Sequence, residues 1–175
     1  MRRTGEVLSV PVGDGYLGRT VDPLGNPIDG LGEIKGIEGR RILEAQAPDV
    51  MHRHPVDEPL STGLKAIDAM TPIGRGQRQL IIGDKKTGKT QITLDAIANQ
   101  KGKNMVCIYV AIGKTKKQVK RVYQELLAKG CMSYTIILAA FNDDTPPVLY
   151  LTPYVAASIA EKFMMEGCLL YTSPS

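Results

Sequence analysis

The stretch LIIGDKKTGKTQITL, residues 80–94, decides the fold of this chain. Its apolar run at residues 80–82 ends at a glycine, which predicts a short strand buried on both faces of a sheet. Residues 83–90 then match the pattern G-x-x-x-x-G-K-[ST], and amphipathic sequence follows. A glycine-rich loop between a strand and a helix lets backbone N–H groups and the helix N-terminus converge on one anion. The stretch therefore predicts a phosphate-binding loop (P-loop).

The sequence after this loop alternates between short apolar runs and segments with helical spacing. Strands are predicted at residues 105–111 and 134–141, and helices at residues 88–100, 115–129 and 152–167. Strands separated by helices of roughly 10–15 residues predict an α/β fold, with a parallel sheet and helices on both faces.

Composition restricts the class of protein. Hydrophobic residues make up 43% of the 175 residues and charged residues 23%, which disfavours disorder, collagen and coiled coils. The 22 Lys and Arg against 18 Asp and Glu give a net charge of +4, which is compatible with a polyanionic ligand without requiring one. The three cysteines show no C-x-x-C spacing, so neither a disulfide framework nor a zinc site is predicted. No apolar run approaches the ~20 residues that cross a bilayer, so any membrane association is expected through a partner.

The candidate binding residues are those of the loop itself. They are Gly83, Asp84, Lys85, Lys86, Thr87, Gly88, Lys89 and Thr90. The backbone of residues 83–88 is expected to hold phosphate oxygens, and Lys89 to add a cation for the β and γ phosphates. The hydroxyl of Thr90 is the predicted Mg²⁺ ligand. The loop thus predicts a bound nucleoside triphosphate with Mg²⁺, but it does not predict hydrolysis.

Hydrolysis would need a second acid for Mg²⁺ and a residue that orients the attacking water. Asp143 and Asp144 follow a predicted strand and are candidates for the acid, although residues 142–147, NDDTPP, are also an ordinary turn that caps the next segment. At the end of the strand 105–111, where a carboxylate would orient water, the chain has Lys114, whose ammonium cannot accept a proton. No catalytic residue is therefore assigned.

Motifs around the loop resemble one known family. Residues 62–68 read TGLKAID and residues 72–78 read PIGRGQR, and with the loop they resemble the alpha/beta family of rotary ATPases. The loop form G-D-x-x-T-G-K-T is similar to the alpha branch of that family in F-type ATP synthases, whereas the catalytic beta branch has G-G-A-G-V-G-K-T. Further alpha-like segments lie at residues 2–6, 10–13, 24–30 and 150–154. The resemblance covers residues 2–167.

This resemblance implies a domain organisation. Residues 11–167 would form a P-loop (RecA-like) nucleotide-binding domain that is incomplete, and residues 1–10 the last strand of a truncated N-terminal β-barrel. After Gly167 the family continues into a strand that ends in Asp-Asp, the acid of the Mg²⁺ site. Here residues 168–175 read CLLYTSPS and contain no acid. We therefore expect residues 168–175 to be foreign or mis-read sequence, which is excluded from reasoning about the fold.

The resemblance also implies a function. It implies a non-catalytic, regulatory alpha subunit that binds Mg²⁺ with ATP (or ADP), in a complex that makes ATP from ADP and phosphate using a proton or sodium gradient. The complex is a translocase, while this chain itself is expected to be non-catalytic. The implied partners are beta subunits in an alternating hexamer and the gamma and delta subunits, with no nucleic acid. The implied location is peripheral, on the cytoplasmic face of the bacterial plasma membrane rather than in an organelle, through the membrane-embedded sector alone.

Two alternatives remain open. An RNA helicase of the transcription-terminator type shares P-I-G-R-G-Q-R, and the lysines of residues 114–121 would be its basic patch, but the chain has only 5% aromatic residues to stack on bases. A catalytic rotary ATPase of a secretion or flagellar export apparatus would have a glutamate where this chain has Lys114. The alpha branch usually has glutamine there, and Arg-Gln where this chain has Lys85 and Lys86, so these three lysines depart from the alpha pattern.

Overall fold

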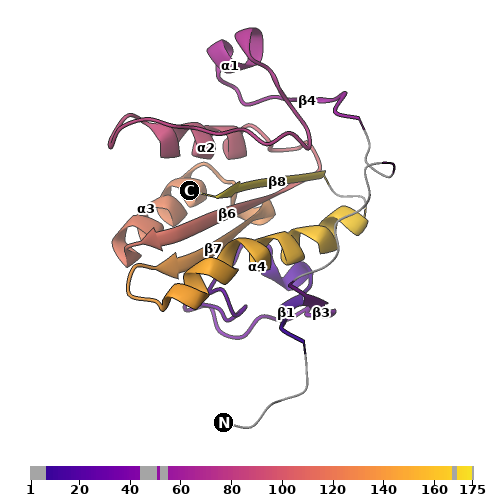
Figure 1. The fold of residues 1–175 in the computed structure, drawn as a ribbon, viewed down its shortest axis with the longest axis vertical. Coiled ribbons are helices and arrows are strands. Elements are labelled where there is room, and N and C mark those ends of the chain that lie inside the picture. Colours follow the sequence, from indigo (N-terminus) through magenta and orange to yellow (C-terminus); the bar gives the residue numbers. More distant parts are fainter. Residues whose placement is uncertain (1–6, 44–50, 52–54, 167–168, 175) are drawn as a thin grey trace.

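The fold is organised around a four-stranded sheet in the order β2-β7-β6-β8 (Figure 1). Its strands are β2 (Thr20–Val21), β6 (Met105–Lys114), β7 (Thr135–Phe141) and β8 (Leu169–Pro174), and each neighbouring pair is parallel. The computed structural model describes residues 7–43, 51, 55–166 and 169–174. The predicted α/β class with a parallel sheet is confirmed.

Strand β6 takes part in two separate hydrophobic cores. Residues 105–111 are all buried, and none exposes more than the 7% of Val106. Successive side chains of a strand point to opposite faces, so the even-numbered residues 106–110 pack against α4 (Pro146–Met165). The odd-numbered residues 105–111 pack against α2 (Lys89–Ala98) and α3 (Lys116–Ala128). Helices therefore cover both faces of the sheet, as predicted.

Helix α3 begins where the sequence predicts. The Thr115 hydroxyl accepts a hydrogen bond from the Gln118 N–H at 3.3 Å, and the Gln118 amide oxygen accepts one from the Thr115 N–H at 2.9 Å. This reciprocal pair is a capping box, which satisfies two N–H groups that have no partner within the helix. It fixes the point at which the chain leaves β6 and turns back along the sheet.

Helix α4 begins earlier than predicted, at Pro146 instead of residue 152. Pro146 and Pro147 occupy the first turn, where their missing N–H groups cost nothing. Thr152, the first residue of the predicted helix, lies inside α4, where its hydroxyl donates to the Val148 carbonyl oxygen at 2.7 Å. The dipeptide Thr152-Pro153 therefore does not start the helix, because an earlier pair of prolines already does.

The strand predicted at residues 80–82 is not formed. Leu80, Ile81 and Ile82 lie in an irregular segment between β5 and α2, and Leu80 and Ile82 are 76% and 81% exposed. Strand β6 has β7 along one edge and β8 along the other, so neither of its edges is open to a further strand. Apolar sequence alone does not make a strand, because a strand also needs a neighbour with unpaired backbone groups.

Residues 169–174 form β8, which pairs in parallel with β6 from Met105 to Val110. The sequence predicts that residues 168–175 are foreign or mis-read, and this pairing does not test that prediction. Parallel pairing needs only backbone groups in register, so it does not depend on an acidic strand end. Whether these residues are foreign sequence stays a prediction.

The N-terminal segment packs against α4. Strand β1 (Ser9–Val12) pairs antiparallel with β3 (Gly39–Ile42), and Val10 and Val12 join the α4 core. The other short elements are η1 (Asp14–Tyr16), β4 (Pro59–Leu60), α1 (Lys65–Met70), β5 (Ile73–Gly74) and η3 (Met132–Tyr134), with β4 and β5 forming a small antiparallel pair. Of the predicted barrel strand at residues 1–10, residues 1–6 lie outside the described part of the chain.

Lys162 ties this N-terminal segment to α4. Its side chain is only 7% exposed, and its ammonium pairs with the carboxylates of Asp14, Glu38 at 3.0 Å and Glu166 at 3.1 Å. Burial acts to lower the pKa of Lys162, but the three carboxylates, Asp14 first among them, outweigh burial and raise that pKa. The lysine thus stays charged and joins segments far apart in sequence.

A second ion pair holds the loop that follows β2. Arg19 donates to both carboxylate oxygens of Asp29, at 2.6 and 2.9 Å, and the Thr20 N–H donates to Asp29 at 3.1 Å. Burial acts to raise the pKa of Asp29, but the Arg19 hydrogen bond and the backbone N–H groups of Leu31 and Thr20 outweigh burial and hold it at about 2. The carboxylate is therefore stabilised in its charged form.

We expect Asp29 to make the free energy of unfolding depend on pH in the acidic range. The pKa of Asp29 is about 2 in the folded chain against 3.8 ordinarily. Its contribution to the free energy of unfolding is therefore complete above about pH 5 and is lost as the pH falls toward 2. Asp29→Asn should lower the free energy of unfolding by roughly 2 kcal/mol at pH 6 and by about half as much at pH 3. Urea unfolding at both pH values measures this, with the exposed Asp143→Asn as control. Equal losses at the two pH values would contradict the expectation.

We also expect Lys162→Met to loosen the N-terminal segment. The three carboxylates left behind are about half exposed or more, so the loss is that of the ion pairs, about 1–2 kcal/mol, and not that of a buried unpaired charge. Thermal unfolding of this variant beside Lys120→Met, which removes an exposed charge from α3, checks the prediction. A Lys162→Met chain as stable as the Lys120→Met chain would be evidence against it.

Candidate nucleotide-binding site

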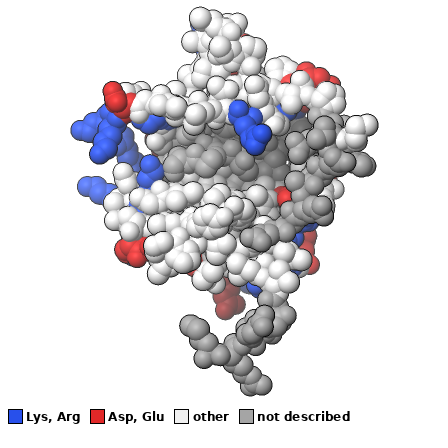
Figure 2. Space-filling view, viewed as in Figure 1, with Lys and Arg blue, Asp and Glu red and all other residues white. Residues whose placement is uncertain are grey.

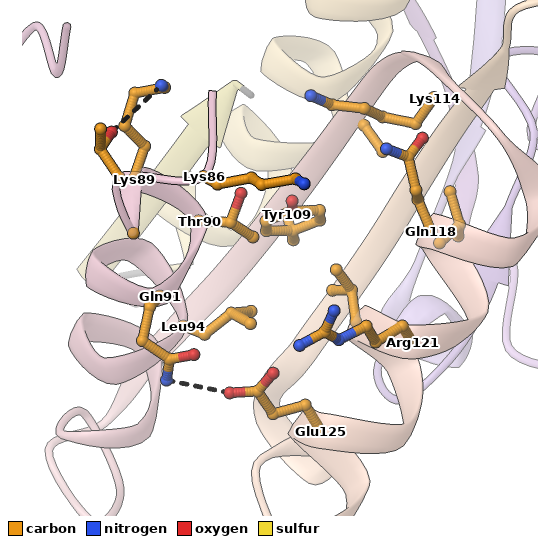
Figure 3. Close-up of a pocket in the computed structure, with 15 residues that line it drawn as sticks. Lys86, Lys89, Thr90, Gln91, Leu94, Tyr109, Lys114, Gln118, Arg121 and Glu125 are labelled. Atoms are coloured by element: carbon orange, nitrogen blue, oxygen red, sulfur yellow. Dashed lines mark hydrogen bonds between the residues drawn. The ribbon is translucent and has the colours of Figure 1, made fainter. Parts of the chain in front are cut away.

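A cavity of about 420 Å³ lies beside the P-loop, between α2 and α3 (Figure 3). Tyr109 and Ala111 of β6 form its floor, Leu94 lies on the α2 side, and Val119 and Val122 lie on the α3 side. This volume is within the usual range for small-molecule sites, and an apolar lining with a few polar groups is typical of them. The carboxyl ends of parallel strands are where such sites form in α/β folds.

Of the eight predicted site residues, five line this cavity. They are Lys86, Thr87, Gly88, Lys89 and Thr90. Gly83, Asp84 and Lys85 are not among its lining residues, and they form the preceding part of the loop. The structure therefore brings the second half of the predicted site together at one cavity.

Two residues with positive φ shape the loop. Gly88, the N-cap of α2, has a φ of 93°, and a Cβ there would meet no atom within 4 Å, so glycine is needed for the backbone angle and not for space. Lys86 has a φ of 68°, which is uncommon for a residue with a side chain. Left-handed residues in a tight loop turn neighbouring N–H groups to one side, which makes an anion-binding concavity. The first N–H groups of α2 have no partner within the helix and lie at the same place.

Lys89 closes the loop on itself. Its ammonium donates to the carbonyl oxygens of Gly83, at 2.5 Å, and of Asp84. The Thr87 hydroxyl donates to the same Asp84 carbonyl at 2.8 Å. The Lys89 ammonium also donates to the Thr87 hydroxyl oxygen at 3.5 Å, so the loop is held in a curved shape by its own lysine.

Lys86 and Thr90 lie on the cavity side of the loop, together with Tyr109 of β6 below them (Figure 3). The Thr90 backbone carbonyl accepts from the Thr93 hydroxyl at 2.8 Å, and within the described residues no hydrogen bond is made by the Thr90 hydroxyl. A threonine hydroxyl on the first turn after the loop is suited to Mg²⁺.

The acids near the site are already engaged. Glu125, on α3, is the one carboxylate among the residues that line the cavity, and it accepts from Gln91 at 3.0 Å and pairs with Lys129 at 3.3 Å. Asp144 caps the turn after β7, where it accepts from the Phe141 N–H at 2.6 Å. Among the described residues, no group of three or more acids, histidines or cysteines is arranged to hold a metal ion.

A β-bulge near the end of β6 sets the direction of Lys114. Ile112 pairs with Ala140 and Lys114 pairs with Phe141, so Gly113 is the additional residue, and its φ is 64°. Phe141 packs on the core shared with α2 and α3, and Lys114 lies opposite it. Without the bulge Lys114 would share the face of Ile112, against α4. The bulge therefore turns Lys114 to the cavity.

Sequence reasoning missed several cavity residues. Gln118, Arg121 and Glu125 line it from α3, and Tyr109 lines it from mid-strand. The i, i+3, i+7 spacing of the three α3 residues is a signal that one helix face is shared, but Tyr109 carries no signal that separates it from its buried neighbours.

None of the helices within the described ranges combines the length and apolar character that crossing a membrane requires.

Comparison with known proteins gives the family of this chain. The model of the ATP synthase alpha/beta family, nucleotide-binding domain, matches residues 63–171. The ATP synthase subunit alpha of Bifidobacterium longum (strain DJO10A) is 65% identical over 175 residues, which is 95% of this chain and 32% of that protein. The alpha subunits of Cutibacterium acnes (58% identical; 95% and 32%) and Streptococcus gordonii (54% identical; 95% and 33%) are also similar.

This chain thus spans about a third of the length of the curated relatives it matches. The predicted alpha-branch resemblance is confirmed, and neither the RNA helicase nor the export ATPase is favoured. The chain belongs to the ATP synthase alpha/beta family.

Proposed function

We propose that this chain binds ATP or ADP with Mg²⁺ at residues 83–90 and does not hydrolyse it. The observation that carries the proposal is the P-loop itself, in which Lys89, two left-handed residues and the N-terminus of α2 all meet at a cavity. Lys89 and the backbone of residues 83–88 would hold the phosphates, and Thr90 would bind Mg²⁺. Mg²⁺ bound there would neutralise phosphate charge.

The cavity chemistry supports a non-catalytic role. Lys114 stands at the carboxyl end of β6, where it cannot act as a base, and Glu125 is held by Gln91 and Lys129. Water activation needs a free acceptor near the terminal phosphate. The similar proteins are named ATP synthase subunit alpha, and the alpha branch is the one whose resemblance implies a non-catalytic site.

The likeness to alpha subunits extends the proposal to an assembly. The chain would act as alpha-subunit sequence in an F-type ATP synthase, a translocase, in which it alternates with beta subunits in a hexamer and contacts the gamma and delta subunits. It would be peripheral, on the cytoplasmic face of a bacterial plasma membrane, and β1 would belong to an N-terminal barrel. The coupling ion, H⁺ or Na⁺, is a property of the membrane sector.

Replacement of Lys89 tests the proposed site. Lys89→Ala removes a charged phosphate donor, so we expect Mg-ATP to bind about 10–100-fold more weakly. Titration of a fluorescent ATP analogue into the full chain in excess Mg²⁺ measures this, with the exposed Lys117→Ala on α3 as matched control. Thr90→Ala should reduce the gain in affinity that Mg²⁺ gives, and no variant should release phosphate. Binding that is unchanged in Lys89→Ala, or steady phosphate release by the parent chain, would overturn the proposal.

A further inference from the structure

Three cations at the cavity have no counter-charge in the described part of the chain. Lys86, Lys114 and Arg121 all line the cavity, and their side chains make no ion pair or hydrogen bond with the described residues. Glu125 does not compensate them, because its carboxylate pairs with Lys129 outside the cavity lining. Like charges around one cavity repel, and an anion with several charges would relieve that repulsion.

These three cations differ in position. Lys86 reaches into the cavity from the P-loop, above Tyr109 and near Thr90, and Lys114 reaches in from the other side, from the end of β6 (Figure 3). Arg121 lies farther along α3, beside Glu125, which follows one turn later in the same helix (Figure 3). The two lysines are therefore the pair placed at the phosphate end of the site.

The backbone of β6 turns Lys114 toward the phosphate end of the cavity. The bulge at Gly113 places Lys114 on the face that α2 and α3 cover, while the regular alternation of β6 would have placed it against α4. Beyond the cavity, exposed lysines continue along the start of α3, at residues 116, 117 and 120, and Figure 2 shows Lys and Arg gathered on this side of the molecule. Only Lys114 of this series lines the cavity.

We propose that Lys114, together with Lys86, binds the terminal phosphate of the nucleotide and supplies part of the charge neutralisation that Mg²⁺ otherwise gives. This inference rests on the proposed function of the P-loop. An ammonium on the wall opposite Lys89 would contact phosphate oxygens that the loop does not enclose, in charge-assisted hydrogen bonds. The site would thus bind metal-free triphosphate well, and it would prefer nucleotides with more phosphates.

Nucleotide titrations with and without metal test this. The full chain, Lys114→Gln and the matched control Lys117→Gln are titrated with ATP, ADP and AMP, each in excess Mg²⁺ and again in EDTA. We expect Lys114→Gln to weaken metal-free ATP by about 10-fold or more, Mg-ATP by roughly 3-fold, and AMP not at all. Lys117→Gln should match the parent chain under every condition. Lys114→Arg, which keeps the charge, should retain most of the metal-free binding.

The outcomes separate the two proposals. If Lys114→Gln and Lys117→Gln bind every nucleotide alike while binding still requires Lys89, the role of Lys114 is wrong and the P-loop function stands. If the parent chain binds no nucleotide, or binds it equally well after Lys89→Ala, both proposals fail. Circular dichroism shows whether Lys114→Gln is folded. If it is not, Lys114→Arg decides, because retained metal-free binding supports the role of charge and its loss overturns it.

Discussion

The burial of β6 on both faces is the constraint on which the rest of the structure depends. Its side chains alternate between a core under α4 and a core under α2 and α3, so one strand sets the place of three helices. Full burial of each large apolar side chain contributes about 1.5–3 kcal/mol to the free energy of unfolding. The same alternation decides what faces the cavity, because Tyr109 and Ala111 lie on its floor while their neighbours lie under α4.

Much of this architecture was predictable from sequence, for reasons that particular residues show. The run at residues 105–111 is uniformly apolar, and Thr115 with Gln118 is a local capping signal, so both elements follow from short-range chemistry. Leu80–Ile82 carries the same apolar signal as β6 but forms no strand, because strand pairing depends on which edges are available. Local propensity thus predicts which residues prefer burial, and tertiary pairing decides which of them obtain it.

The candidate site, too, was only partly predictable from sequence. The residues of the P-loop are recognisable because glycine, lysine and threonine at fixed spacing have a local task, and five of the eight line the cavity. The opposite wall of the cavity comes from α3 and the end of β6. Its residues depend on how α3 lies across the sheet and on Gly113, the additional residue of the bulge in β6. No spacing rule within the loop contains that information, so Arg121 and Glu125 become visible only in three dimensions.

The open position of Leu80–Ile82 also has a consequence for handling the chain. All three of these apolar side chains are exposed, and β8 is the last strand in the sheet order. A sheet edge and an uncovered apolar segment are the two features that promote self-association of β-rich surfaces. We therefore expect residues 80–82 to contribute to self-association at high concentration, beside other exposed apolar side chains such as Leu31 and Met70.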